Sequence, residues 1–119
     1  MTPKSGADLV GEAKARIREV TVAESMVLLA ASAAVFFDCR EPNEYNLGHV
    51  PGAVFLPRGN LETKVEAMIP REAKVIVYCA TGNRSALAAD TMQQMGYADV
   101  ASMRGGWRDW VMGDGPVDE

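Results

Sequence analysis

Val75-Ile-Val-Tyr-Cys79-Ala-Thr-Gly-Asn-Arg84-Ser85 carries an apolar run straight into a glycine-containing turn. Residues 75–78 are mostly β-branched, which is typical of a strand whose two faces are both buried. Beyond the turn, apolar side chains recur at helical spacing up to residue 95. A buried strand, a tight turn and a helix in this order indicate a parallel sheet, with Cys79 at the carboxyl end of one strand.

Similar elements are predicted elsewhere in the chain. The capping-box sequence Thr21-Val-Ala-Glu24 predicts the start of a helix, and Trp107 and Trp110 suggest a short final helix. Strands alternating with helices predict one α/β domain with a mainly parallel sheet. The polar residues 113–119 are expected to be frayed. Three further apolar runs predict strands, at residues 35–37, 54–56 and 99–103.

Composition narrows the class of protein. The 119 residues suit a single domain, here residues 16–119, preceded by a tail or short docked helix at 1–15. A net charge of −4 argues against nucleic acid as a partner, and no apolar run is long enough for a membrane span. Two cysteines and one histidine are too few for a disulfide scaffold or a structural metal site, so no metal is expected. The first residues do not have the form of a signal peptide, so a reducing, cytoplasmic location is expected.

The loop after Cys79 favours an ionised thiol. If it curls around the sulfur, the backbone amides of residues 80–85 can point inward, and the following helix adds its positive end. Gly82 allows the tight turn, and Arg84 adds a fixed positive charge. A thiolate held in this way is a nucleophile, and the same loop would hold an anion bound to the sulfur. The alternative interpretation is a small buried side chain at a strand end, which is the commoner role of a free cysteine.

Three motifs in the chain resemble those of the rhodanese-like family. Residues 38–53, Asp-Cys-Arg-Glu-Pro-Asn-Glu-Tyr-Asn-Leu-Gly-His-Val-Pro-Gly-Ala, match the pattern D-x-R-x-x-x-E-[YF]-x-x-G-H-[IV]-x-G-A. Residues 79–85 are similar to the family's active-site loop C-x-x-G-x-R-S, and residues 105–107 to its G-G-[WF] turn. The motifs stand in family order, and the resemblance covers about residues 16–113.

The resemblance implies a fold and a reaction. The fold would be a five-stranded, mainly parallel sheet with helices on both faces. Cys79 would take a sulfane sulfur from an anionic donor such as thiosulfate and hold it as a persulfide. It would then pass the sulfur to cyanide or a thiol, including that of a thioredoxin-like protein, with no cofactor and no metal. The substrate-binding residues would be Ala80, Thr81, Gly82, Asn83, Arg84, Ser85 and Arg58, and the supporting residues Asp38 and Arg40.

Several alternatives remain open from the sequence. A regulatory or docking module without activity, and a sulfur carrier with protein donor and acceptor, share the same fold. Related phosphatases and arsenate reductases use H-C-x5-R, whereas four residues separate Cys79 from Arg84 here. Asp38 either holds Arg40 or loop amides or forms an ordinary strand-end ion pair, and Glu44 could join that network. His49 is expected to be structural. Cys39 has no role in the family pattern, although a resolving thiol is conceivable if it lies close enough to Cys79.

Overall fold

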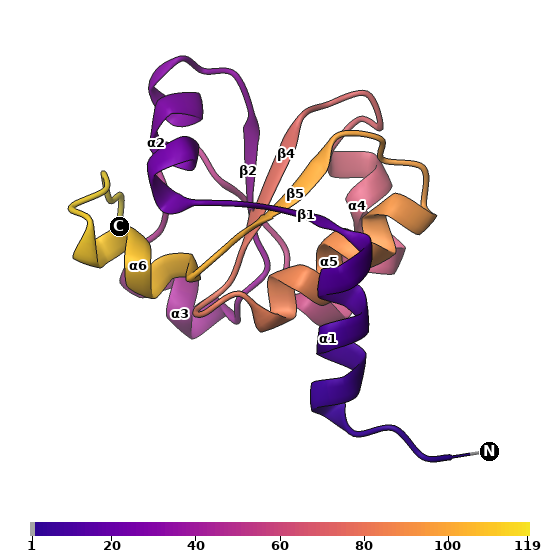
Figure 1. The fold of residues 1–119 in the computed structure, drawn as a ribbon. Helices are drawn as coiled ribbons and strands as arrows, with labels where there is room; N and C mark the ends of the chain where they lie inside the picture. Colours follow the sequence, from indigo (N-terminus) through magenta and orange to yellow (C-terminus); the bar gives the residue numbers. More distant parts are fainter. Residues whose placement is uncertain (1) are drawn as a thin grey trace.

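The computed structural model describes residues 2–119 as one five-stranded sheet in which every neighbouring pair of strands is parallel. The strand order is β1-β5-β4-β2-β3, with helices on both faces (Figure 1). The predicted fold class is therefore confirmed. The strands are β1 (Arg18–Val20), β2 (Val35–Asp38), β3 (Val54–Phe55), β4 (Val75–Tyr78) and β5 (Val100–Met103). The helices are α1 (Gly6–Arg16), α2 (Val22–Ala30), α3 (Pro42–Leu47), α4 (Leu61–Met68), α5 (Asn83–Gln94) and α6 (Gly106–Met112), with a 3-10 turn η1 at Arg58–Asn60.

Strand β4 is the centre of the sheet, between β5 and β2. All four of its residues are fully buried, as the continuous apolar run predicts. Successive side chains point to opposite faces, so Val75 and Val77 join one core while Ile76 and Tyr78 join the other. Cys79 continues this alternation and lies on the face of Val75 and Val77.

Two helical layers cover the sheet. Helices α1, α4 and α5 lie on one side of it, and α2 and α6 lie on the other (Figure 1). The first core contains Phe37, Leu61 and Met92, and the second is built around Trp110, which meets Phe36 edge to face. Because apolar residues fill both faces, the carboxyl ends of the central strands are the place left for chemistry.

Some elements were not foreseen. The edge strand β1 is short and mostly charged, and α3 has no buried residue but begins with a proline and a capping box between Glu41 and Glu44. Helix α4 does carry an apolar stripe, with Leu61 and Val65 buried one turn apart. The expectation of a frayed tail at 113–119 is wrong. Asp118 exchanges two backbone hydrogen bonds of 2.9 Å with His49, and the Trp110 indole donates to the carbonyl of Pro116 at 2.8 Å. Within residues 2–119 no helix has the length and apolar character needed to cross a membrane.

A buried ion pair closes the carboxyl end of β2. Arg40 donates to both carboxylate oxygens of Asp38, at 3.0 and 2.8 Å, and to the carbonyl of Gly48 at 2.7 Å. The Tyr78 hydroxyl donates to the same carboxylate at 2.7 Å. Asp38 is 0% exposed and Arg40 3%, so water cannot stabilise either charge, and each is stabilised by the other.

Removal of this carboxylate should be costly. We expect Asp38→Ala to lower the free energy of unfolding by about 3 kcal/mol or more, because it leaves a buried guanidinium without its counter-charge. Urea denaturation followed by far-ultraviolet circular dichroism measures the loss.

Asp99 supplies the matched control, since it pairs with Arg18 and Lys74 on the surface and is 43% exposed. Asp99→Ala should cost about 1 kcal/mol or less. Equal losses for the two variants would contradict a structural role for the buried pair.

Candidate active site

The loop between β4 and α5 encloses the sulfur of Cys79. The backbone N–H groups of Gly82 and Ser85 point at Sγ, at 3.1 and 3.3 Å, and the Ser85 hydroxyl lies 3.4 Å from it. Helix α5 begins at Asn83, so its positive end faces the same atom. Cys79 itself is fully buried. The geometry is that of an anion site formed around a side chain.

The loop holds this shape because a second turn supports it from behind. The N–H of Trp107 donates to the carbonyl of Cys79 at 2.8 Å, and that of Arg108 to the carbonyl of Ala80 at 3.1 Å. Gly106 has a φ of +56°, and a Cβ there would overlap the Cys79 carbonyl. With both carbonyls directed toward residues 106–108, the amides that follow face the sulfur. The Gly-Gly-Trp turn is therefore part of the site.

Electrostatics favour the ionised form of Cys79. Its pKa falls from the ordinary 9.0 to about 4, chiefly because of the neighbouring Cys39 thiol, with further contributions from Ser85 and the Gly82 amide. Burial acts in the opposite direction and is outweighed. The pKa of Cys39 is raised well above its ordinary value, since it faces Cys79 in a buried place. One thiolate and one thiol are thus expected to lie side by side.

Two serines extend the site inward from the sulfur. The hydroxyl of Ser85 lies 2.8 Å from that of Ser102 on β5, and both residues are fully buried. A thiolate can only accept hydrogen bonds, so Ser85 must donate to it and accept from Ser102. Sequence reasoning missed Ser102. The available signal was a polar residue inside a short apolar strand.

Arg84 carries the positive charge at the end of the loop, and Glu44 of α3 already pairs with it. The two side chains form a bidentate contact, with N–O distances of 2.8 and 3.1 Å. This contact lowers the pKa of Glu44 to about 2 and raises that of Arg84. Roughly a third of each side chain is exposed, at 36% and 28%. Glu44 therefore bonds the loop directly, and its charge also interacts with that of Arg40, although it forms no hydrogen bond to Asp38 or Arg40.

The other predicted loop residues play smaller parts. Ala80 contributes its carbonyl to the support described above, while the side chains of Thr81 and Asn83 are exposed. The hydrogen bonds to Sγ come from Gly82 and Ser85. These donors form the cradle around the sulfur, which uses fewer backbone amides than the expected ring from Ala80 to Ser85.

Arg58 lies on the Cys79 side of the sheet but is engaged elsewhere. Its guanidinium bonds to Glu62 at 3.1 Å and to the Thr91 hydroxyl at 3.1 Å. Thr91 lies in the second half of α5, well beyond the end of the helix that meets the sulfur. The structure thus brings Arg58 to α4 and α5 and not to the loop.

Asp38 and Arg40 lie across the sheet from the Cys79 thiol. The Arg40 guanidinium stands 4.7 Å from the ring centre of Trp107 and 5.6 Å from that of Tyr78. Since the Trp107 backbone holds the Cys79 carbonyl, this pair supports the loop from the opposite face. His49 stacks on Tyr45 at 3.8 Å between ring centres, and its Nδ1 lies 3.0 Å from the Tyr45 carbonyl, a structural arrangement.

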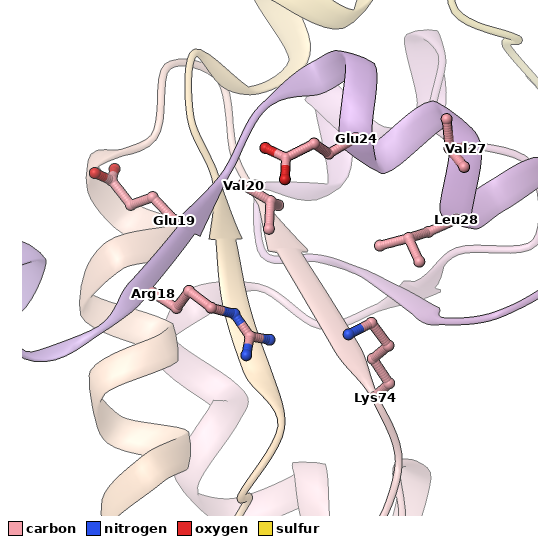
Figure 2. Close-up of a pocket in the computed structure, with 7 residues that line it drawn as sticks. All are labelled: Arg18, Glu19, Val20, Glu24, Val27, Leu28 and Lys74. Atoms are coloured by element: carbon pink, nitrogen blue, oxygen red, sulfur yellow. The ribbon is translucent and has the colours of Figure 1, made fainter.

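A surface hollow of about 420 Å³ lies elsewhere, between β1 and α2 (Figure 2). Arg18 and Lys74 point into it from the amino-terminal ends of their strands, and both pair with Asp99. Cys79 follows a carboxyl end, so this hollow is separate from the candidate site. Among residues 2–119, no three His, Cys, Asp or Glu side chains are grouped closely enough to hold a metal ion.

Known proteins match most of this chain. It is 33% identical over 95 residues to the thiosulfate sulfurtransferase GlpE of Pseudoalteromonas translucida, covering 78% of this chain and 88% of GlpE. It is 36% identical over 74 residues to YrkF of Bacillus subtilis, provisionally named a sulfur carrier, covering 62% of this chain and 40% of YrkF. The solved structure of RPA3614 from Rhodopseudomonas palustris, suggested to be a tyrosine phosphatase, superposes with a TM-score of 0.88 at 34% identity, over 99% of this chain and 97% of that one.

The family assignment agrees with the loop, the sheet and the glycine turn described above. The family model described as the Rhodanese-like domain matches residues 21–112, which include β2, the Cys79 loop and α6. The match covers well over half of the chain and runs through every residue that contacts the Cys79 sulfur. This chain belongs to the rhodanese-like domain family.

Proposed function

We propose that the protein is a sulfurtransferase that moves a sulfane sulfur from thiosulfate, or a similar donor, to a nucleophilic acceptor through a persulfide on Cys79. The observation that carries the proposal is that the Cys79 sulfur accepts hydrogen bonds from the backbone N–H groups of Gly82 and Ser85, at the start of α5. The names of the GlpE and YrkF relatives support the same chemistry. Acceptors would be cyanide or thiols, including that of a thioredoxin-like protein.

The first step is attack of the Cys79 thiolate on the outer sulfur of thiosulfate. The S–S bond of the donor breaks, and sulfite leaves with the bonding electron pair. Because the thiol is already ionised, no general base is required, which suits a site without a histidine. The Gly82 and Ser85 donors, together with the Ser85 hydroxyl, stabilise negative charge on the sulfurs throughout the step.

The second step regenerates the enzyme. An acceptor such as cyanide or a thiolate attacks the outer sulfur of the persulfide, and Cys79 leaves as a thiolate. A sulfur with a low pKa is a good leaving group, so the hydrogen bonds that prepare the first step also speed the second. The same cradle serves both half-reactions.

Arg84 is a partly exposed cation in the loop that encloses Cys79. The Cys79 thiol is covered, while the Arg84–Glu44 pair beside the loop is partly exposed. A dianionic donor can compete with the Glu44 carboxylate for the guanidinium, which would draw the donor toward the sulfur. Glu44 thus holds Arg84 in place in the absence of the donor.

Phosphatase chemistry is less well supported by this loop. A tetrahedral phosphoryl group needs a wider ring of donors than the two amides that reach Sγ here. A sulfur carrier with protein partners would use the same persulfide, and a docking module would not need the low pKa of Cys79.

The proposal is tested directly at the nucleophile. Cys79→Ser should abolish sulfite release from thiosulfate, because a hydroxyl at this position stays protonated and cannot accept the sulfur. Intact mass spectrometry of the wild type should show an adduct of about 32 Da on Cys79, which the variant lacks. Thermal unfolding of the variant serves as the control for folding. Sulfite release by Cys79→Ser at the wild-type rate would refute the proposal, and absence of both sulfite release and the adduct from the wild type would favour a docking module.

The ionisation of Cys79 can be titrated. The difference in ultraviolet thiolate absorbance between wild type and Cys79→Ser should show a step near pH 4, with the thiolate present above it and lost below it. In Ser85→Ala the step should move to higher pH, because one donor to the thiolate is gone. A step in the ordinary range near pH 9 in the wild type would contradict the geometry described above.

Arg84 is tested through donor kinetics. Arg84→Ala should lower kcat/KM for thiosulfate by about tenfold or more, equivalent to about 1.4 kcal/mol of transition-state stabilisation. Arg18→Ala is the charge-matched control, because Arg18 lies at the opposite end of the sheet. Arg58→Ala measures in the same assay the substrate-binding role predicted for that residue. Equal kcat/KM values for Arg84→Ala and Arg18→Ala would show that Arg84 does not meet the donor.

A further inference from the structure

Cys39 and Cys79 occupy matching positions on two neighbouring strands. The last paired residues of β2 and β4 are Asp38 and Tyr78, and the two cysteines follow them directly. The N–H of Cys39 donates to the carbonyl of Tyr78 at 3.1 Å, which continues the parallel ladder to this point. Both cysteines belong to the same core cluster, so their side chains lie on the same face of the sheet.

This placement puts the two cysteines side by side on neighbouring strands, at a backbone spacing that a disulfide can bridge. Neighbouring strands lie about 4.8 Å apart, inside the Cα–Cα range of about 4.4–6.8 Å that a disulfide spans. The sulfur of Cys39 lies 3.4 Å from the carbonyl oxygen of Tyr78, the residue that immediately precedes Cys79. Cys39 is 1% exposed, so Cys79 is the thiol that can reach it.

We propose that Cys39 is a resolving thiol, which discharges the Cys79 persulfide as hydrosulfide and leaves a Cys39–Cys79 disulfide. The inference rests on the proposed function, because it needs the persulfide as its substrate. It adds a second outlet for the sulfur, used when no acceptor occupies the site.

The step balances without an outside oxidant. The Cys39 sulfur attacks the inner sulfur of the persulfide, forming the Cys39–Cys79 bond and breaking the bond between the inner and outer sulfurs. The outer sulfur leaves with the electron pair and takes the proton of Cys39, departing as hydrosulfide. Cys39 and Cys79 are thereby oxidised to a disulfide, and the sulfane sulfur is reduced to sulfide. A dithiol reductant would return both cysteines to the reduced form by thiol–disulfide exchange.

The surroundings of Cys39 suit a thiol that attacks the persulfide only when no acceptor is present. Next to a thiolate it keeps its proton, because a second buried negative charge would be unfavourable. It therefore reacts slowly while an acceptor competes for the outer sulfur, and its proton remains available for the leaving group. The persulfide is then removed before oxygen can oxidise it irreversibly.

The test is a single turnover under strict exclusion of oxygen, with one equivalent of thiosulfate and no acceptor. Sulfite, sulfide and the intact mass of the chain are followed together. Sulfite reports formation of the persulfide, and sulfide reports its resolution. In the wild type we expect sulfite first, then sulfide in equal amount. The adduct of about 32 Da should give way to a chain about 2 Da lighter than the starting protein. Cys39→Ser and Cys39→Ala should release sulfite more slowly, because the Cys39 thiol is the largest cause of the low pKa of Cys79, and should keep the adduct and release no sulfide.

The outcomes separate this inference from the function on which it rests. If the wild type releases sulfite but keeps the adduct without sulfide, the resolving role is refuted and the sulfurtransferase proposal stands. Equal sulfide yield per sulfite from wild type and Cys39→Ser would also refute it, because the sulfur would then leave by another route. If no sulfite forms, both proposals fall together. Two substitutions at Cys39, one polar and one apolar, guard against misreading a variant that folds poorly.

Discussion

Two peptide N–H groups directed at one buried sulfur are the constraint on which this molecule depends. For Gly82 and Ser85 to point inward, the carbonyls of Cys79 and Ala80 must point outward and find donors of their own. Those donors are the amides of Trp107 and Arg108, which can approach only because residue 106 lacks a side chain. The site is therefore assembled from two loops that are far apart in sequence.

Because side chains alternate along β4, the residues that support the loop and the Cys79 sulfur lie on opposite faces of the sheet. Tyr78 points to one face, where its hydroxyl, Asp38 and Arg40 form a buried polar network behind Trp107. Cys79 points to the other face, where α5 presents its amino-terminal end. A strand changes face at each residue, so one peptide bond separates the structural residue Tyr78 from the proposed nucleophile Cys79.

The parts that could be predicted from sequence are those governed by local patterns. The runs at 35–38 and 75–78 become central strands because both faces are buried, and the glycine turn after Cys79 marks the loop. By contrast β1, Arg-Glu-Val, is a short edge strand with charged residues and has no such pattern. The pairing of Arg84 with Glu44 and the contact of Ser85 with Ser102 also escaped prediction. They join residues 40 and 17 positions apart, and only the folded sheet brings them together.

The docked ends of the chain bear on where this domain can be cut. The family match stops at residue 112, but residues beyond it are also held in place. The backbone of Asp118 hydrogen-bonds to that of His49, and the carbonyl of Pro116 accepts a hydrogen bond from the Trp110 indole. At the amino-terminal end, Ala13 of α1 is fully buried, and the Arg16 guanidinium donates two hydrogen bonds to the carboxylate of Asp90 on α5. A recombinant fragment trimmed to the family limits would lose both contacts, exposing apolar surface on α5 and leaving the indole without an acceptor.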